Sequence, residues 1–492
     1  MKELSHYLHD LDEVQWLTFL QYLELLPDKN EPWKKIRQLA ELVRGEKDKN
    51  LGAAYYSKIL YGEEKTDTIE RMERMLKKRY LEFITLDYNL SADEKDFDYV
   101  SIQLEKKATA FRTLSRTKNS HGSERDLLDE IIKVAKEYEC YPVLVAHLKL
   151  KKQYWSHLGQ ENYDALCSEI ECYKKNEDAA ALTTDCLCRL QMLEHYNKSE
   201  NPLDFINKKI PLLKKIVADY NYKYAVYVLK LFEQEEQTLL KNYERAAAIC
   251  FEIVEIVEKN KQIKTRHRMG IAQAQLSKTL IYSNRFSASI KHARKSLEYF
   301  PYASPNYICS KEDEFYGLFY NKEYIKAEEC IRFILAHSSA EESGEFHYAI
   351  FNLLLANVLF MQKKFAEALQ LLQGPLEISQ DKAGWAIGLR LLRILIHIEL
   401  AKHDEASKQI EQLRKFIEFT ESNQTEVTLR NKTIVKFLSL ADKAGFVFSR
   451  LNGKAHEHLS ELKTGNNGNA WEYFSSELIP IHEWATSTTK KP

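Results

Sequence analysis

The chain has 492 residues, and its 71 Lys and Arg against 72 Asp and Glu leave a formal net charge of −1. A near-neutral chain has no global field that would draw it to nucleic acid or to a membrane surface. Gly (15) and Pro (10) fall well below average usage, and charged residues make up 29%. Because this composition favours helix and no alternating β-branched run predicts a strand, we expect an all-α protein.

Residues 1–90 are predicted to form an N-terminal helical module. An apolar stripe runs from Leu4 to Leu26, and Pro27 ends it because proline cannot continue a helix. This opening carries acids and has no long apolar run, so we expect neither a signal peptide nor a membrane span. Further helices are predicted over 33–44, 53–61 and 66–86.

Residues 91–124 are predicted to be a helical linker region, and residues 125–240 a set of degenerate helical pairs. Ser91, with Glu94 three residues on, has the spacing of a capping box. The polar run SRTKNSHGSER at 115–125 is the strongest loop signal of this half. Helices are predicted over 126–139, 142–158, 161–175, 178–197, 203–219 and 222–240, with breaks at Pro142, Gly159, 197–202 and 219–222.

A repeated opening marks residues 241–445. Five times, a ring or imidazole is followed three residues later by a small residue and an apolar helical pattern. The small residues are 43, 38, 41 and 38 positions apart, and a period of that size indicates a helical solenoid. The five pairs are Tyr243/Ala246, Phe286/Ser289, Tyr324/Ala327, Phe365/Ala368 and His403/Ala406.

These units resemble tetratricopeptide (TPR) repeats, in which two antiparallel helices pack through small residues and an aromatic residue opens the second helix. Ala356 stands at the family's first small position, and Phe365 with Ala368 matches its Y-x-x-A. The resemblance covers about residues 225–420, and the start of the chain is similar to that of some bacterial TPR-containing proteins. The period here is longer than the family's period of about 34 residues. The resemblance implies a TPR-like α-α superhelix with a groove for peptides or partner proteins.

Residues 446–492 are predicted to form a C-terminal cap and a disordered tail. The stretch TGNNGN at 464–469 indicates a turn. Trp471 to Trp484 is predicted as a last amphipathic helix, interrupted by Pro480. We expect it to cover the open end of the solenoid, because terminal faces need capping.

No catalytic constellation stands out. The chain has no Gly-rich phosphate loop, no G-x-S-x-G and no H-E-x-x-H, so we expect no enzyme, no catalytic residues and no cofactor. His456 and His458 would point roughly 200° apart on a helix, and Cys167 with Cys172 lacks a second pair, so no metal site is expected. Most of the eight cysteines lie in apolar helical patterns, which favours reduced thiols and a cytoplasmic location.

If the TPR register holds, the first helices of successive repeats turn one set of side chains toward the concave side. A lysine, an asparagine and several tyrosines suit an extended peptide or a terminal carboxylate. The candidate partner-binding groove consists of Lys278, Tyr282, Tyr316, Tyr320 and Asn357, together with Arg390 and Arg393.

Arg390 and Arg393 form a cationic stripe with His397, at i, i+3 and i+7 of an otherwise apolar helix. Such groups need either water or an anionic partner, so partner binding is one interpretation. The other interpretation is that they border solvent and pair with Glu or Asp of neighbouring helices.

A basic unit runs from Lys259 to Leu297, with ten Lys or Arg and no Asp or Glu. An acidic peptide, a partner's carboxylates or a phosphate backbone would be drawn to it. The alternative is a solvated basic face that complements the acid-rich helix before it. The candidate basic patch is Lys264, Arg266, Arg268, Arg285, Lys291, Arg294 and Lys295.

From the sequence we hypothesise a non-enzymatic scaffold or adaptor that holds a protein or peptide partner, an acidic one among the options, in its concave groove. A second hypothesis is a peptide-responsive regulator whose N-terminal module engages a target. A third is an RNA-binding repeat protein that uses the basic 259–297 unit, although the near-zero net charge weighs against nucleic acid.

Overall fold

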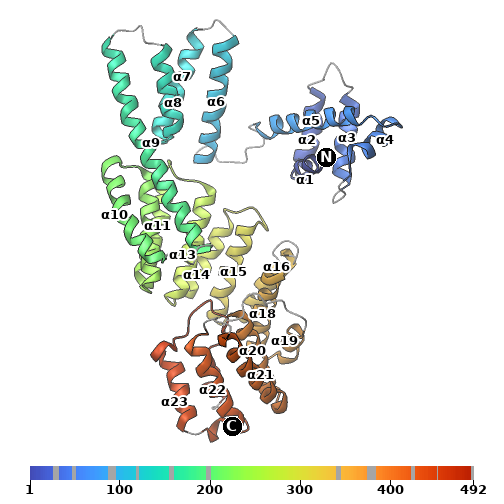
Figure 1. The fold of residues 1–492 in the computed structure, drawn as a ribbon, viewed down its shortest axis with the longest axis vertical. Helices are drawn as coiled ribbons and strands as arrows, with labels where there is room; N and C mark the ends of the chain where they lie inside the picture. The colour runs from blue at the N-terminus through green and yellow to red at the C-terminus, as the bar shows by residue number, and fades with distance from the viewer. Residues whose placement is uncertain are drawn as a thin grey trace. The chain divides into compact units, whose positions relative to one another are not determined.

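The computed structural model is all-α, as predicted: the residues that it describes form 23 α-helices and two short 3-10 helices, and they include no strand. The chain divides into two compact units, Met1–Gln103 and Leu104–Pro492 (Figure 1). The finer division predicted from the sequence stays a prediction. The described residues are 1–25, 33–46, 51–86, 96–117, 121–154, 160–195, 201–338, 345–373, 384–422, 427–451 and 453–488.

The first unit is a bundle with a core of rings and aliphatic side chains. Its helices are α1 (Lys2–His9), α2 (Glu13–Leu25), α3 (Trp33–Gly45), α4 (Ala53–Tyr61) and α5 (Thr66–Ile84). The ring of Phe19 in α2 packs against Phe83 in α5, with centroids 5.2 Å apart. The N-terminal ammonium donates to Glu73 at 2.5 Å, which ties the start of α1 to α5. The apolar stripe predicted from Leu4 onward is divided between two helices, α1 and α2.

The first helices of the second unit differ from the prediction in two places. They are α6 (Phe97–Thr117), inside which the two units divide, α7 (His121–Glu137), α8 (Tyr141–Tyr154), α9 (Gln160–His195) and α10 (Pro202–Tyr220). Helix α9 runs unbroken for 36 residues where the sequence predicts two helices, because no Gly or Pro interrupts it. The loop predicted at 115–125 is helical up to 117 and from 121 on. The predicted capping box at 91–94 lies outside the described residues.

From α11 on, the helices form hairpins. The pairs are α11 (Lys223–Leu239) with α12 (Tyr243–Lys259), α13 (Arg266–Tyr282) with α14 (Phe286–Leu297), α15 (Pro305–Tyr320) with α16 (Tyr324–His337), α18 (Glu345–Met361) with α19 (Phe365–Leu371), and α20 (Trp385–Glu399) with α21 (His403–Ser422). Each ring or imidazole of the sequence motif is the first residue of a second helix. The motif therefore predicted where the second helix of each of the five hairpins begins.

Every one of these hairpins turns at a residue with left-handed backbone. The φ angles lie between 54° and 65°, and the following residue donates its N–H to a carbonyl five residues back, as Glu323 does to Leu318 at 2.9 Å. This Schellman-type bond satisfies a carbonyl that the helix end would leave open. The left-handed residues are Lys241, Asn284, Lys322, Lys363 and Ala401.

The small residues of the motif lie where paired helices touch. Ala246, Ser289, Ala327, Ala368 and Ala406 are each 0% exposed. A longer side chain at any of them would force the two helices apart, because protein interiors are close-packed. This burial explains why the motif demands a small residue three positions after the ring.

The C-terminal region differs from the prediction in one of its helices. Its elements are α22 (Leu429–Lys443), η2 (Phe448–Arg450), α23 (Gly453–Thr464), η3 (Asn466–Gly468) and α24 (Ile481–Thr488). The helix predicted from Trp471 is therefore wrong up to Pro480, because those residues form turns and bends and only the last part is helical. The disordered tail predicted for the last residues falls on 489–492, outside the described residues.

Candidate functional site

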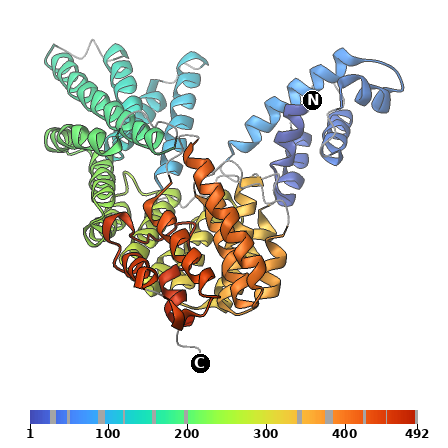
Figure 2. The same cartoon turned by 60° about the horizontal axis from the view of Figure 1, so that its bottom comes forward.

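The non-helical stretch before α24 contacts α13, α15 and α20, which are first helices of three hairpins. Figure 2 shows the C-terminal region, in red, beside the hairpin helices. Its predicted role as a cap stays a prediction. We call residues 470–476 the docked segment. The surface of α13, α15 and α20 that contacts this region is here called the first-helix face. The contacts below show how the docked segment, which turns at Tyr473 and Phe474, is held on this face.

Phe474 is the residue of the docked segment that meets the predicted groove. Its ring centroid lies 4.6 Å from that of Tyr316 and 5.1 Å from that of Tyr282. The ammonium of Lys278 lies 5.7 Å from the same centroid, within reach of a cation–π contact. The backbone N–H of Phe474 donates to the hydroxyl of Tyr320 at 3.2 Å. The structure thus brings Lys278, Tyr282, Tyr316 and Tyr320 together around one ring of the same chain.

Tyr473 makes a second aromatic contact beside the first. Its centroid lies 4.9 Å from that of Tyr320 and 5.9 Å from that of Phe286. Its hydroxyl donates to the side-chain oxygen of Asn284, the left-handed residue of the α13–α14 turn. Burial raises the pKa of Tyr282 to about 12, so this tyrosine stays neutral at physiological pH.

Two further contacts fix the path of the docked segment. Near its start, the Glu472 carboxylate pairs with the ammonium of Lys241, and both side chains are exposed. At its end, the backbone of Ser476 crosses α20 at Gly388, where an added Cβ would lie 2.4 Å from the Ser476 carbonyl oxygen. Only glycine allows the backbone to approach α20 this closely.

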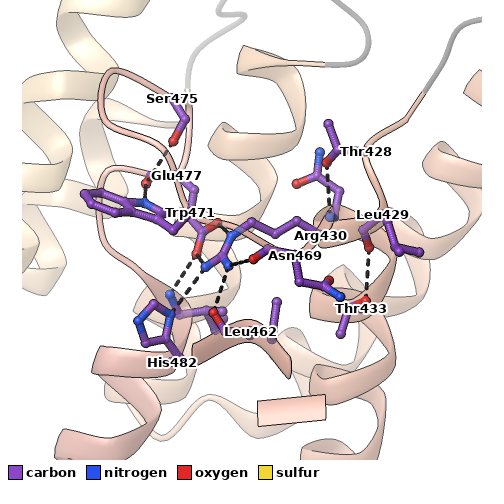
Figure 3. A network of polar contacts seen from close by, with 12 residues as sticks. Thr428, Leu429, Arg430, Thr433, Leu462, Asn469, Trp471, Ser475, Glu477 and His482 are labelled. Carbon is purple, nitrogen blue, oxygen red and sulfur yellow. Dashed lines mark hydrogen bonds and ion pairs between the residues drawn. The ribbon is translucent and has the colours of Figure 1, made fainter. Parts of the chain in front are cut away.

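One buried arginine, Arg430 of α22, holds both ends of the docked segment (Figure 3). Its Nε and Nη2 donate to the Glu477 carboxylate at 2.5 and 2.8 Å, and its Nη1 donates to the Asn469 carbonyl at 2.5 Å. The same carboxylate accepts the N–H of Ile481 at 2.8 Å. Both charged side chains are buried, and each compensates the other. The residues that flank the segment, Asn469 and Glu477, form its base and are therefore fixed independently of residues 472–476, which form its tip.

Helix α24 is anchored to the hairpins beyond this arginine. The indole N–H of Trp484 donates to the carboxylate of Glu399, at the end of α20, at 2.9 Å. His482 accepts a long hydrogen bond of 3.4 Å from Arg430. Burial, with the positive charges of Arg430 and Lys463, lowers the pKa of His482 to about 4, so this ring is neutral near pH 7.

A cavity of about 530 Å³ lies between the C-terminal region and the hairpin turns. That volume falls in the range of ligand pockets, roughly 300–1,000 Å³. Lys322 and Lys363, two of the left-handed turn residues, and the carboxylates Glu399 and Glu483 supply its charged groups. Its ring-bearing wall includes Phe286, Tyr320, Tyr324, Phe365, Trp471 and Trp484.

Two carboxyl groups of α15, those of Glu312 and Asp313, lie within electrostatic reach of Lys278. Burial raises the pKa of Asp313 to about 8; the charge of Glu312 acts in the same direction, and that of Lys278 opposes it. Burial also raises the pKa of Glu312, and the charge of Lys278 opposes that shift. Neither carboxylate forms an ion pair within 4 Å with a described residue.

The other predicted groove residues lie elsewhere. Asn357 in α18 is buried, and its amide donates to the Leu353 carbonyl of its own helix at 2.8 Å. The Arg390 guanidinium lies over the ring of Phe416 in α21, 4.3 Å from its centroid. Burial lowers the pKa of both Arg390 and Arg393, and neither forms an ion pair with a described residue. The structure does not bring these three to Phe474, and their part in partner binding stays a prediction.

The basic patch is spread over the start of α13 and the length of α14. Arg294 donates to the buried carboxylate of Glu314 at 2.6 Å, and Arg266 donates to the Glu298 carbonyl at 2.9 Å. Several of its charges are therefore engaged within the protein, and its role as a binding surface stays a prediction. Arg268 and Arg285 lie over rings, Lys264 and Lys291 are exposed, and Lys295 is half-buried.

Sequence reasoning missed the residues that occupy the first-helix face. The signal lay in Trp471, Tyr473 and Phe474, three rings within four positions, followed by two serines and Pro480. Serine and proline are poor helix interiors, so aromatic residues in that setting favour a docked loop over an amphipathic helix.

Among the described residues, no group of three or more His, Cys, Asp or Glu side chains is placed to hold a metal ion. In the same part of the chain, every helix is too short or too polar to cross a bilayer.

No protein-family model matches the chain, and no curated protein matches it. Among solved structures, the chain is similar to a signal transduction ATPase with numerous domains (STAND) protein with a tetratricopeptide repeat sensor, from Pyrococcus horikoshii. The identity is 13% and the TM-score 0.27, and the match covers 98% of this chain. It covers 66% of that chain, so this chain spans just under two thirds of that protein's length. A match of this quality identifies neither a family nor an activity.

Proposed function

We propose that this protein is a non-enzymatic, TPR-like scaffold that holds a peptide of a partner protein on its first-helix face. One observation carries the proposal: this face already holds a non-helical peptide, the docked segment of the same chain. The tyrosines of α13 and α15 surround Phe474, and the Tyr320 hydroxyl accepts a backbone N–H. Backbone hydrogen bonds with pockets for side chains are the usual means of peptide recognition.

The surroundings of Phe474 support a surface with room for further peptide residues. The cavity of about 530 Å³ continues along the hairpin turns on one side. On the other side, Lys278 offers a positive charge, and the nearby carboxyl groups of Glu312 and Asp313 offer hydrogen-bonding groups to a partner's side chains. A partner peptide would therefore find rings, hydrogen-bond acceptors and charges along one path.

The test is a pull-down from native cell extract, with and without nuclease, using the full chain and matched variants. Lys278→Glu and Tyr282→Ala alter the first-helix face, whereas Lys291→Glu reverses an exposed charge on α14. We expect wild type and K291E to retain the same discrete protein, and the two face variants to retain it at least about ten-fold less. Equal retention by all four proteins would overturn the assignment of the face.

The same experiment addresses the two other functions. Retention that nuclease abolishes, and that K291E alone reduces, would favour RNA binding by the basic 259–297 unit. A partner whose retention depends on the first 86 residues and not on Lys278 would favour the regulator with a target-binding N-terminal module. We place the protein in the cytoplasm, an assignment that its eight free thiols support.

A further inference from the structure

We propose that the docked segment is a removable intrachain ligand, and that the partner peptide carries the same pattern: an acidic residue followed by two aromatic residues, as in Glu472–Tyr473–Phe474. The inference rests on the proposed function and adds the chemistry of the peptide that the first-helix face selects. It also predicts that partner binding begins with release of the docked segment.

The base of the docked segment remains fixed when its tip is released. Arg430 donates to the carbonyl of Asn469, just before the segment, and to the carboxylate of Glu477, just after it. The indole N–H of Trp471 also donates to the Glu477 carbonyl at 2.7 Å, which closes the base a second time. Residues 472–476 can therefore leave the face while the buried ion pair and α24 keep their places.

The tip is held by a small number of contacts, and two of its features lower the cost of release. Phe474 has a left-handed backbone, with φ at +60°, which is unfavourable for a bulky residue and lowers the cost of release. The Glu472–Lys241 ion pair is exposed, and exposed pairs contribute little to stability. What remains is one backbone hydrogen bond, the Tyr473–Asn284 bond and the ring contacts.

Each contact specifies one feature of the peptide. Lys241 selects an acidic residue, because it pairs with the Glu472 carboxylate. Tyr320 and Phe286 receive the first ring, which Tyr473 now supplies. The second ring, now that of Phe474, enters between the α13 and α15 tyrosines, below the ammonium of Lys278.

Competition inside the chain sets the apparent affinity for a partner. A short loop fixed at both ends presents its tip at an effective concentration on the order of mM. A peptide in solution therefore binds the fraction of molecules whose segment is released, and its apparent Kd rises by the inverse of that fraction. Weakening the docked segment should increase affinity for the peptide without any change in the first-helix face.

The experiment is a fluorescence-anisotropy titration of a fluorescein-labelled peptide, AWEYFSSE, which repeats residues 470–477. The released variant is the full chain with Tyr473→Ser and Phe474→Ser. We expect it to bind the peptide with a Kd at least about ten-fold lower than that of wild type. Adding Tyr316→Ala to the released variant should remove the gain, and a peptide with both rings replaced by serine should not bind.

Equal affinity for wild type and released variant, or no binding to either up to about 1 mM peptide, would overturn the inference. If the released variant does not fold, Tyr473→Phe decides, because it removes the hydroxyl that donates to Asn284, leaves the receiving surface unchanged and should give a smaller gain of the same sign. A failed titration together with Lys278-dependent retention of a protein partner would overturn this inference alone. If the titration fails and no protein partner is retained in a Lys278-dependent way, the proposed function is overturned as well.

Discussion

The guanidinium of Arg430 donates two hydrogen bonds, of 2.5 and 2.8 Å, to the carboxylate of Glu477, which lies 47 residues later in the chain. Both side chains are about 7% exposed. This ion pair fastens the stretch before α24 to α22 and positions the docked segment against α13 and α15. The position of the docked segment on the first-helix face thus depends on an ion pair that lies outside that face.

Breaking this pair should be costly. Arg430→Met leaves the Glu477 carboxylate buried without its partner, and such a loss typically costs about 3–5 kcal/mol. Urea unfolding should show that loss in the free energy of unfolding. Arg414→Met, which removes an exposed pair with Glu418, is the control and should cost less than about 1 kcal/mol. Equal costs for the two variants would show that the buried pair is not a structural anchor.

Gly388→Ala should push the C-terminal region off α20. The new methyl group would lie 2.4 Å from the Ser476 carbonyl oxygen, so the backbone must shift. We expect a loss of about 1–3 kcal/mol in thermal unfolding and a change in Trp471 fluorescence. Gly45→Ala, at a site with no atom within 4 Å of the added Cβ, is the control. An unchanged melting temperature and spectrum in G388A would contradict the close crossing.

Ala401→Gly should stabilise the protein. Ala401 turns the last TPR-like hairpin with φ at +54°, a conformation that L-residues adopt at a cost and glycine adopts freely. We expect a gain of about 0.5–1 kcal/mol. Ala406→Gly, five positions later at the buried helix contact, should instead destabilise. Differential scanning calorimetry on both variants gives the sign of each change in stability. A loss of stability in both variants would contradict the turn geometry.

The pKa of Asp313 predicts a pH-dependent effect. This carboxyl keeps its proton up to about pH 8 in the folded protein, whereas it loses it near 3.8 when unfolded. The unfolded chain therefore binds fewer protons between those values, and wild-type stability falls as pH rises through that window. Asp313→Asn has no proton to lose, so its advantage over wild type should grow by at least about 1 kcal/mol from pH 4 to pH 8.

Urea unfolding of both proteins across that pH range checks the prediction. Asp219→Asn, at an exposed site on α10, is the matched control. An Asp313→Asn advantage that stays constant with pH would contradict a buried, protonated carboxyl.

The repeat architecture was predictable because it depends on local rules. A ring that opens a helix, a small residue three positions on and a turn two residues before the ring recur in each hairpin. These features are short-range, so they can be read from spacing alone. The expectation that Lys278 and the α13 and α15 tyrosines share one face came instead from the resemblance to TPR repeats.

The occupant of that face was not predictable because it depends on long-range contacts. Phe474 reaches Tyr320 across 154 positions, and Lys241 reaches Glu472 across 231. The amphipathic pattern from Trp471 suggested a helix, but tertiary contacts with several helices overrode it. Asn357 shows the converse, since its amide bonds its own helix although its register suggested the groove.

The most direct test of peptide binding by the first-helix face is site-specific photo-crosslinking in native extract. A photoreactive phenylalanine analogue replaces Tyr282 in one full-length protein and Ile325, an exposed residue of α16, in another. Adducts are identified by mass spectrometry. The account predicts a discrete partner protein linked at position 282 through a segment with adjacent aromatic residues, and no such adduct at position 325. The same adducts at both positions, or only self-linkage to residues 470–476 at position 282, would contradict it.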